Sequence, residues 1–289
     1  MNKKAFSLIE LSIVILIIGI LIAGVTQSSR LITQIKLASA RQITQSSPVN
    51  SITGIFLWAE STGIDATDIN DPEDSQAITT WKDINPQSLL VKNDITQGNA
   101  TKRPLYKTNA LNGLPALRFD GIDDYLSKTS VSSNSFSSTS QNTIFFVLKS
   151  NSSSGTQILF DYESSNTNRI LVQIQSTLFP RFDFVNDTTG LLSGTAAISS
   201  SNASVLTLEK KSGNQKIYIN GTVQGSKSNS LSFSPFTAEM AIGYYVPAQT
   251  FFVAADIGEI IIFDRALKDE ERESIEAYLG KKWGVNILP

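Results

Sequence analysis

The chain has no histidine and no cysteine, and its carboxylates are the first side chains to consider for chemistry. Ser-His-Asp catalysis, HExxH zinc chemistry and disulfide bonds are therefore excluded. Two carboxylates can hydrolyse a glycosidic bond if they flank it at a set separation. Asp256 and Glu259 are three positions apart in a predicted strand, so strict alternation places them on opposite faces. We expect no catalytic residue and no enzymatic activity.

Three further carboxylates, Asp120, Asp123 and Asp124, fall within FDGIDDYL. Aspartate and glycine supply local side-chain bonding and positive φ where a chain reverses, so a turn is the commoner explanation. The alternative is a polar contact at the rim of a sheet.

Aromatic side chains are the other candidates for ligand contact, since they stack on sugar rings but more often fill cores. Trp58 and Trp81 lie in apolar strand context and are predicted to be core residues. Tyr244 and Tyr245 precede a proline-containing loop, and we expect them, with Tyr162, at a ligand-binding rim.

Glu10 is the one ionisable residue in the apolar run from Phe6 to Val25. Twenty helical residues span roughly 30 Å, the thickness of a bilayer's hydrocarbon core. A carboxylate well inside a bilayer costs about 2.5–3.5 kcal/mol on the insertion scale, which indicates a function. Its partner would be a new α-amino group, created if the chain is cut between Ala5 and Phe6.

The segment KKAFSLIELSIVILIIGILIAGV resembles the type IV prepilin signal, except that Ala5 stands where glycine is usual. The resemblance implies that prepilin peptidase cuts after Ala5 and methylates the amino group of Phe6. Glu10 would then pair with the amino terminus of a neighbouring subunit during assembly. Lys3 and Lys4 would hold the leader in the cytoplasm, with the C-terminus outward.

The elements that must position these residues change character near Pro48. Up to that point the pattern predicts a continuous helix, so we divide the chain into a leader (1–5), a transmembrane and pilin helix (6–47) and a folded domain (48–289). In the domain, short β-type segments such as NTIFFVLKS (142–150) alternate with turn signals, including Asn-Gly at 112–113 and 220–221. This pattern predicts an antiparallel two-sheet β-sandwich. A helix is expected at 267–285.

The domain resembles the concanavalin A-like lectin/glucanase superfamily in its LamG-type branch. The similar stretches are FLWAES, RPLYKTNALNGLPALRFDGIDDYLS, KIYINGTVQG and the closing IGEIIIFDRALKDEERESIEAYLGKKWGV. The resemblance implies a jelly roll, and it makes calcium a possible cofactor at Asp120, Asp123 and Asp124. Function does not follow from this diverse fold.

Together these features predict a type IV pilus or pseudopilus subunit, of the minor kind, that displays a binding or adhesion domain for a carbohydrate or a protein. The alternative is a type II secretion pseudopilin-like component that recruits exoproteins; a secreted glycosidase is the remaining possibility. The expected partners are prepilin peptidase, other pilin subunits and the inner membrane, followed by a periplasmic or extracellular filament. A net charge of −2 gives no electrostatic footprint for nucleic acid.

Overall fold

The computed structural model describes residues 8–64, 72–88, 91–133, 136, 141–165, 167–185, 189–232 and 234–288. The chain divides into two compact units, Met1–Ser39 and Ala40–Pro289. Each unit is described by itself.

The first unit contains most of helix α1 (Leu8–Gln45). Apolar side chains between Leu11 and Ile22 are about half to two-thirds exposed, for example Ile20 at 64%. Among the helices that the structure describes, none combines the length and the apolarity needed to cross a membrane. The helix ends just before Pro48, which begins the short helix η1 (Pro48–Ser51) after the Ser47 hydroxyl accepts the N–H of Val49.

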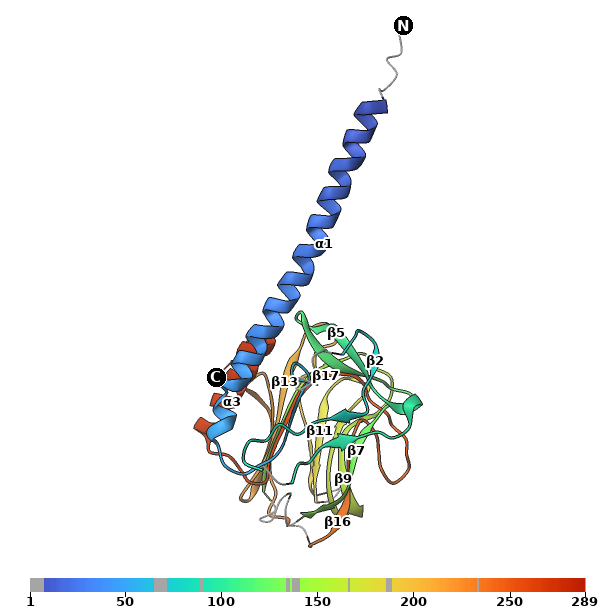
Figure 1. The fold of residues 1–289 in the computed structure, drawn as a ribbon. Coiled ribbons are helices and arrows are strands. Elements are labelled where there is room, and N and C mark those ends of the chain that lie inside the picture. The colour runs from blue at the N-terminus through green and yellow to red at the C-terminus, as the bar shows by residue number, and fades with distance from the viewer. Residues whose placement is uncertain are drawn as a thin grey trace. The chain divides into compact units, whose positions relative to one another are not determined.

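The second unit is an antiparallel two-sheet sandwich, as the sequence predicts (Figure 1). Among the described residues, the first sheet has the order β15 (Thr222–Ser228), β14 (Asn214–Ile219), β13 (Ser204–Lys211), β8 (Asn142–Ser150), β17 (Ala254–Phe263), β6 (Leu114–Asp120), β5 (Leu105–Leu111) and β2 (Gln76–Ala77), and β1 (Ile55–Glu60) also pairs with β17. The second has the order β12 (Leu191–Ser193), β11 (Pro180–Phe184), β10 (Asn168–Ile174), β9 (Gln157–Ser165), β16 (Thr237–Ile242), β7 (Leu126–Ser132), β4 (Ile95–Thr96) and β3 (Thr80–Trp81). Helices η2 (Ala100–Lys102) and α3 (Asp269–Trp283) complete the unit.

Alternation along the strands fills the core between the sheets. In β10, Ile170, Val172 and Ile174 point into this core, while the residues between them face outward. Trp81 is fully buried in the same core, as predicted. Each buried side chain of this size contributes about 1.5–3 kcal/mol of transfer free energy.

The outer face of the first sheet is covered by α3 and by the last turns of α1, from Ala40 onward. Trp58 and Trp283 are fully buried in this second apolar cluster. Their indole N–H groups each donate at 2.8 Å to the carboxylate of Glu259. The predicted core placement of Trp58 is therefore confirmed, and its polar atom has a buried partner.

A β-bulge at Gly258 overturns the prediction for the carboxylates of β17. The pairing of β17 with β8 shifts between Ile257 and Glu259, and both Ile257 and Ile260 point into the core between the sheets. This extra residue puts Asp256 and Glu259 on the same outer face, because a bulge resets the alternation. Strict alternation was the wrong assumption.

The two Asn-Gly turns form tight hairpins, as the sequence predicts. Asn112 and Gly113 have φ of 52° and 86°, and Asn220 and Gly221 have φ of 52° and 84°. Two consecutive positive φ values are the signature of the turn that matches strand twist.

Candidate functional site

A row of polar side chains lies on the outer face of the second sheet, across β9, β10 and β11. Arg169, Leu171 and Gln173 alternate with the core residues of β10, and Asp183 occupies the corresponding face of β11. Arg169, Gln173 and Asp183 are at most 8% exposed. Burial of so many polar groups requires that they satisfy one another or bind a ligand.

Most of these groups form one ionic network. The Arg169 guanidinium contacts Asp183 at 2.5 Å through Nη2 and Glu163 at 3.6 Å through Nη1. Arg181 Nε lies 3.2 Å from Asp183, and the Gln173 amide donates to the same carboxylate at 3.3 Å. Burial raises the pKa of Asp183, and the two arginines oppose this shift. The network thus places the Arg169 guanidinium between two carboxylates.

The buried polar atoms of this cluster that lack a hydrogen-bond partner among the described residues include Nε of Arg169 and Oδ1 of Asp161. Asp161 accepts the backbone N–H of Val246 at 2.8 Å through its other oxygen. Burial, followed by the charge of Glu163, raises the pKa of Asp161 to about 8, so this acid is mostly protonated at neutral pH. A bound water or a ligand group would satisfy such buried atoms.

A cavity of about 280 Å³ opens over Arg169 and is lined by Thr156, Ile158, Arg169, Leu171, Gln173, Tyr245 and Phe251. Phe251 is 53% exposed, and its ring centroid lies 6.2 Å from that of Tyr245. Gln249 and Phe251 both have positive φ, at 53° and 57°. Backbone strain of this sort is found at ligand-binding loops, and an exposed aromatic face suits a sugar ring.

A second cavity of about 290 Å³ shares Thr156 and Phe251 with the first and includes Asp120 and Gly121. Here the structure brings together the three predicted carboxylates: Asp120, Asp123 and Asp124 each offer an oxygen within 4.8 Å of the others. The Asp120 carboxylate also accepts the N–H groups of Ile122 and Asp123, which is the predicted turn. The cluster therefore stabilises the turn, and it holds three carboxylates close together.

These three residues fit calcium as part of a shell. Calcium takes six to eight oxygen ligands, of which three carboxylates supply a fraction and water the remainder. Asp124 is only 5% exposed and accepts the N–H of Asp120 through Oδ2. Burial, followed by the charges of Asp120 and Asp123, raises the pKa of Asp124 to about 7. A bound cation would relieve this repulsion.

Replacing Asp124 by asparagine is expected to stabilise the protein at pH 8 by about 1–2 kcal/mol and to have little effect at pH 4. The folded-state pKa of Asp124 is raised from 3.8 to about 7, so the parent loses stability progressively as pH rises from the lower value to the higher one. Urea unfolding at the two pH values measures this difference, with exposed Glu270→Gln as the matched control. Equal effects of Asp124→Asn at both pH values would contradict this prediction.

Calcium binding has a separate test. A calcium-induced rise in Tm that Asp124→Asn abolishes would assign the metal to these three carboxylates.

The three predicted tyrosines have separate placements. Tyr245 lines the first cavity. Tyr244 is 3% exposed, donates to Glu239 at 3.0 Å and packs against Tyr125 and Phe252. Tyr162 lies fully buried between the sheets and donates to the Val131 carbonyl, a placement that does not support ligand contact.

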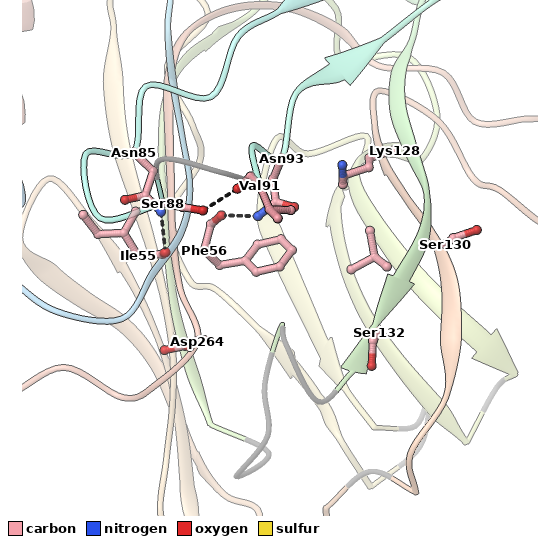
Figure 2. Close-up of a pocket in the computed structure, with 11 residues that line it drawn as sticks. Ile55, Phe56, Asn85, Ser88, Val91, Asn93, Lys128, Ser130, Ser132 and Asp264 are labelled. Atoms are coloured by element: carbon pink, nitrogen blue, oxygen red, sulfur yellow. Dashed lines mark hydrogen bonds between the residues drawn. The ribbon is translucent and has the colours of Figure 1, made fainter.

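A third cavity, of about 300 Å³, lies between the start of β1, residues 85–88 and 91–93, and β7 (Figure 2). Figure 2 shows its amides turned toward backbone: Asn85 donates to the Ile55 carbonyl at 2.7 Å, and Asn93 donates to that of Phe56 at 2.6 Å. The Lys128 ammonium donates to the Lys92 carbonyl. These groups hold the loop against the sheet, so we place the functional site at the first two cavities instead.

Sequence reasoning did not find Arg169, Gln173 or Phe251. A signal was present in RILVQIQ (169–175), where polar residues occupy alternate positions of an otherwise apolar strand. The contribution of Phe251 depends on its loop returning over the sheet, which no local pattern indicates. Ala5 and Phe6 lie outside the described residues, and of Glu10 the structure describes only the backbone, within α1.

The fold and the site define a class: a two-sheet lectin-like sandwich with an aromatic-edged cavity on one outer face. The chain belongs to the concanavalin A-like lectin/glucanases superfamily, whose family model matches residues 120–271, just over half of the sequence. A second model, the prokaryotic N-terminal methylation motif, matches residues 1–26. Both predicted resemblances are confirmed. The search of curated proteins found no match.

The similar solved structures include sialidases from Trypanosoma rangeli. One, in complex with sialic acid, has 11% identity and a TM-score of 0.54, and the match covers 80% of this chain and 33% of that one. Another has 13% identity and a TM-score of 0.52, with the same coverage. The chain thus spans about a third of the length of these sialidases, and the likeness shows the fold.

These comparisons correct one prediction. We expected from the residue types that the protein is not an enzyme, and that conclusion does not stand, because solved structures with the same fold include sialidases. The fold does not separate binding from catalysis, so enzyme status is not established by the residue pattern.

Proposed function

We propose that this protein is a minor subunit of a type IV pilus or of a related pseudopilus, and that it displays the sandwich as a carbohydrate-binding domain. The observation that carries the proposal is the joining of a prepilin methylation motif to a concanavalin A-like domain in one chain. The motif implies processing by prepilin peptidase and assembly with other pilin subunits.

In this proposal the chain first resides in the inner membrane with its C-terminus outward, and cleavage after Ala5 then releases Phe6 as the methylated N-terminus. Glu10 follows four residues later and pairs with that amino group on a neighbouring subunit. The apolar, exposed side chains of α1 from Leu11 onward support burial against other helices, because apolar surface of this extent is rarely left in water.

Replacing Glu10 by leucine is expected to abolish entry into filaments while leaving the chain in the membrane, because the charge pairing is lost and the apolar run is preserved. The fraction of the protein in sheared filaments measures this effect. Glu10→Asp keeps the charge and should retain part of the assembly. Mass spectrometry should find methylated Phe6 first in the mature chain. An intact leader, or unchanged assembly of Glu10→Leu, would refute the filament role.

The proposed ligand site is the pair of cavities that meet at Phe251. An exposed aromatic ring, a guanidinium in the lining and several uncharged polar groups are the elements expected of a sugar site. A protein surface is the other ligand that such a domain could bind. Glycan array binding by the full chain in mild detergent tests the carbohydrate proposal directly.

A further inference from the structure

The cavity over Arg169 is poor in net positive charge. Among the described residues that line this cavity and its neighbour, Arg169 is the single cation, and its charge is matched by Glu163 and Asp183. Arg181, on β11, also contacts Asp183. The cluster therefore has two arginines facing two carboxylates, without counting Asp161.

The other charged groups near the cavity add negative charge. Glu239 on β16 and Glu163 on β9 both act on Asp161, and the Asp120–Asp124 cluster borders the second cavity beyond Phe251. An anionic ligand would meet these carboxylates at short range in a partly buried site, where repulsion is screened least.

The geometry of Arg169 also argues against a carboxylate ligand. An arginine binds a carboxylate strongly through two parallel N–H donors. Nη2 of Arg169 already donates to Asp183, and Nη1 lies 3.6 Å from Glu163, so both terminal nitrogens already face carboxylates of the protein. A carboxylate ligand would have to compete with these two acids, whereas a neutral acceptor, such as a sugar hydroxyl or the carbonyl of an acetamido group, adds no charge to the cluster.

The remaining lining completes a site for an uncharged sugar. Thr156 and Gln173 offer neutral polar groups, while Phe251 and Tyr245 offer ring faces. A pyranose presents this combination of hydroxyl edges and an apolar face.

We infer that the cavity formed by Arg169, Gln173, Tyr245 and Phe251 binds uncharged saccharides and discriminates against sialic acid and other carboxylate-bearing sugars. The inference rests on the proposed carbohydrate-binding function and specifies its ligand class. It runs against the simplest expectation from the sialidase likeness, because the ligand of a structural relative does not transfer with the fold.

The test uses the full chain in mild detergent, titrated with neutral hexose and N-acetylhexosamine oligosaccharides and with the sialylated form of each. We expect a neutral oligosaccharide to bind at least about tenfold more tightly than its sialylated form. Its affinity should change little between low and high salt, because no net charge is neutralised on binding. Tighter binding of a sialylated form would overturn the inference and leave the proposed function intact. Failure of every sugar to bind would overturn both.

Two variants locate the ligand. Phe251→Ala should weaken neutral-sugar binding about tenfold, whereas Val223→Ala, an equally exposed apolar residue on β15, should not. Glu163→Gln removes one of the two anions facing Arg169, so it should narrow the preference for neutral over sialylated sugar several-fold, with exposed Glu270→Gln as the control. An unchanged preference in Glu163→Gln, or full neutral-sugar binding by Phe251→Ala, would exclude this cavity as the site.

Discussion

Replacing Lys282 by methionine is expected to lower the free energy of unfolding by about 3–5 kcal/mol, because it leaves two buried carboxylates without their cation. The Lys282 ammonium lies 2.9 Å from oxygens of both Glu60 and Glu259, and all three side chains are at most 3% exposed. Burial opposes ionisation of Glu60, yet the Lys282 charge and the Thr62 hydrogen bonds hold its pKa below the ordinary value. The stabilisation from Glu60 is therefore present at neutral pH and is lost on acidification.

Urea unfolding at pH 7 measures this loss. Lys281→Met is the matched control, since Lys281 is the adjacent residue on α3 but is exposed, and its replacement should change stability by less than about 0.5 kcal/mol. Equal unfolding free energies for the two variants would show that the ionic cluster is not what ties α3 to the sheet.

Replacing Gly258 by alanine is expected to destabilise the protein by about 2–3 kcal/mol through overpacking. A Cβ at this position would lie 2.5 Å from the Trp283 ring, with two more ring atoms within 2.9 Å. Trp283 cannot withdraw without breaking its hydrogen bond to Glu259. Thermal melting of the full chain provides the measurement.

Gly98→Ala is the corresponding control, because no atom lies within 4 Å of a Cβ placed there. It should leave Tm within about 1–2 °C of the parent value. A tolerated Gly258→Ala would mean that Trp283 and the bulge can move apart at little cost, and would remove the packing explanation for this glycine.

Much of the fold could be predicted because its signals are local. Asn112 and Asn220 are each followed by glycine, and this dipeptide predicts a hairpin. Trp58 and Trp81 lie in apolar strands, which predicts that they are buried. The C-terminal helix was expected at 267–285 and spans Asp269–Trp283. The family resemblances at both ends of the chain were likewise carried by short contiguous stretches.

The candidate site was harder to predict from the sequence because its residues come from distant segments of the chain. Arg169 belongs to the site because Glu163 and Asp183 on neighbouring strands pair with it. A loop more than 70 residues later in the chain places Phe251 at the same cavity. Asp256 and Glu259 were assigned to different faces because a bulge depends on what packs against it, here Trp283, and leaves no periodic mark in the sequence.

The position of β17 in the first sheet has a consequence for how the protein matures. This strand is buried along all ten residues and pairs with β8 on one edge and with β6 and β1 on the other. Glu60 of β1 lies opposite Glu259, about two hundred positions later in the chain. The first sheet is therefore incomplete until β17, its last strand in the sequence, has been inserted, and contacts this distant in sequence form slowly. Until then β1 and one edge each of β6 and β8 lack their partner strand, and such open edges favour aggregation.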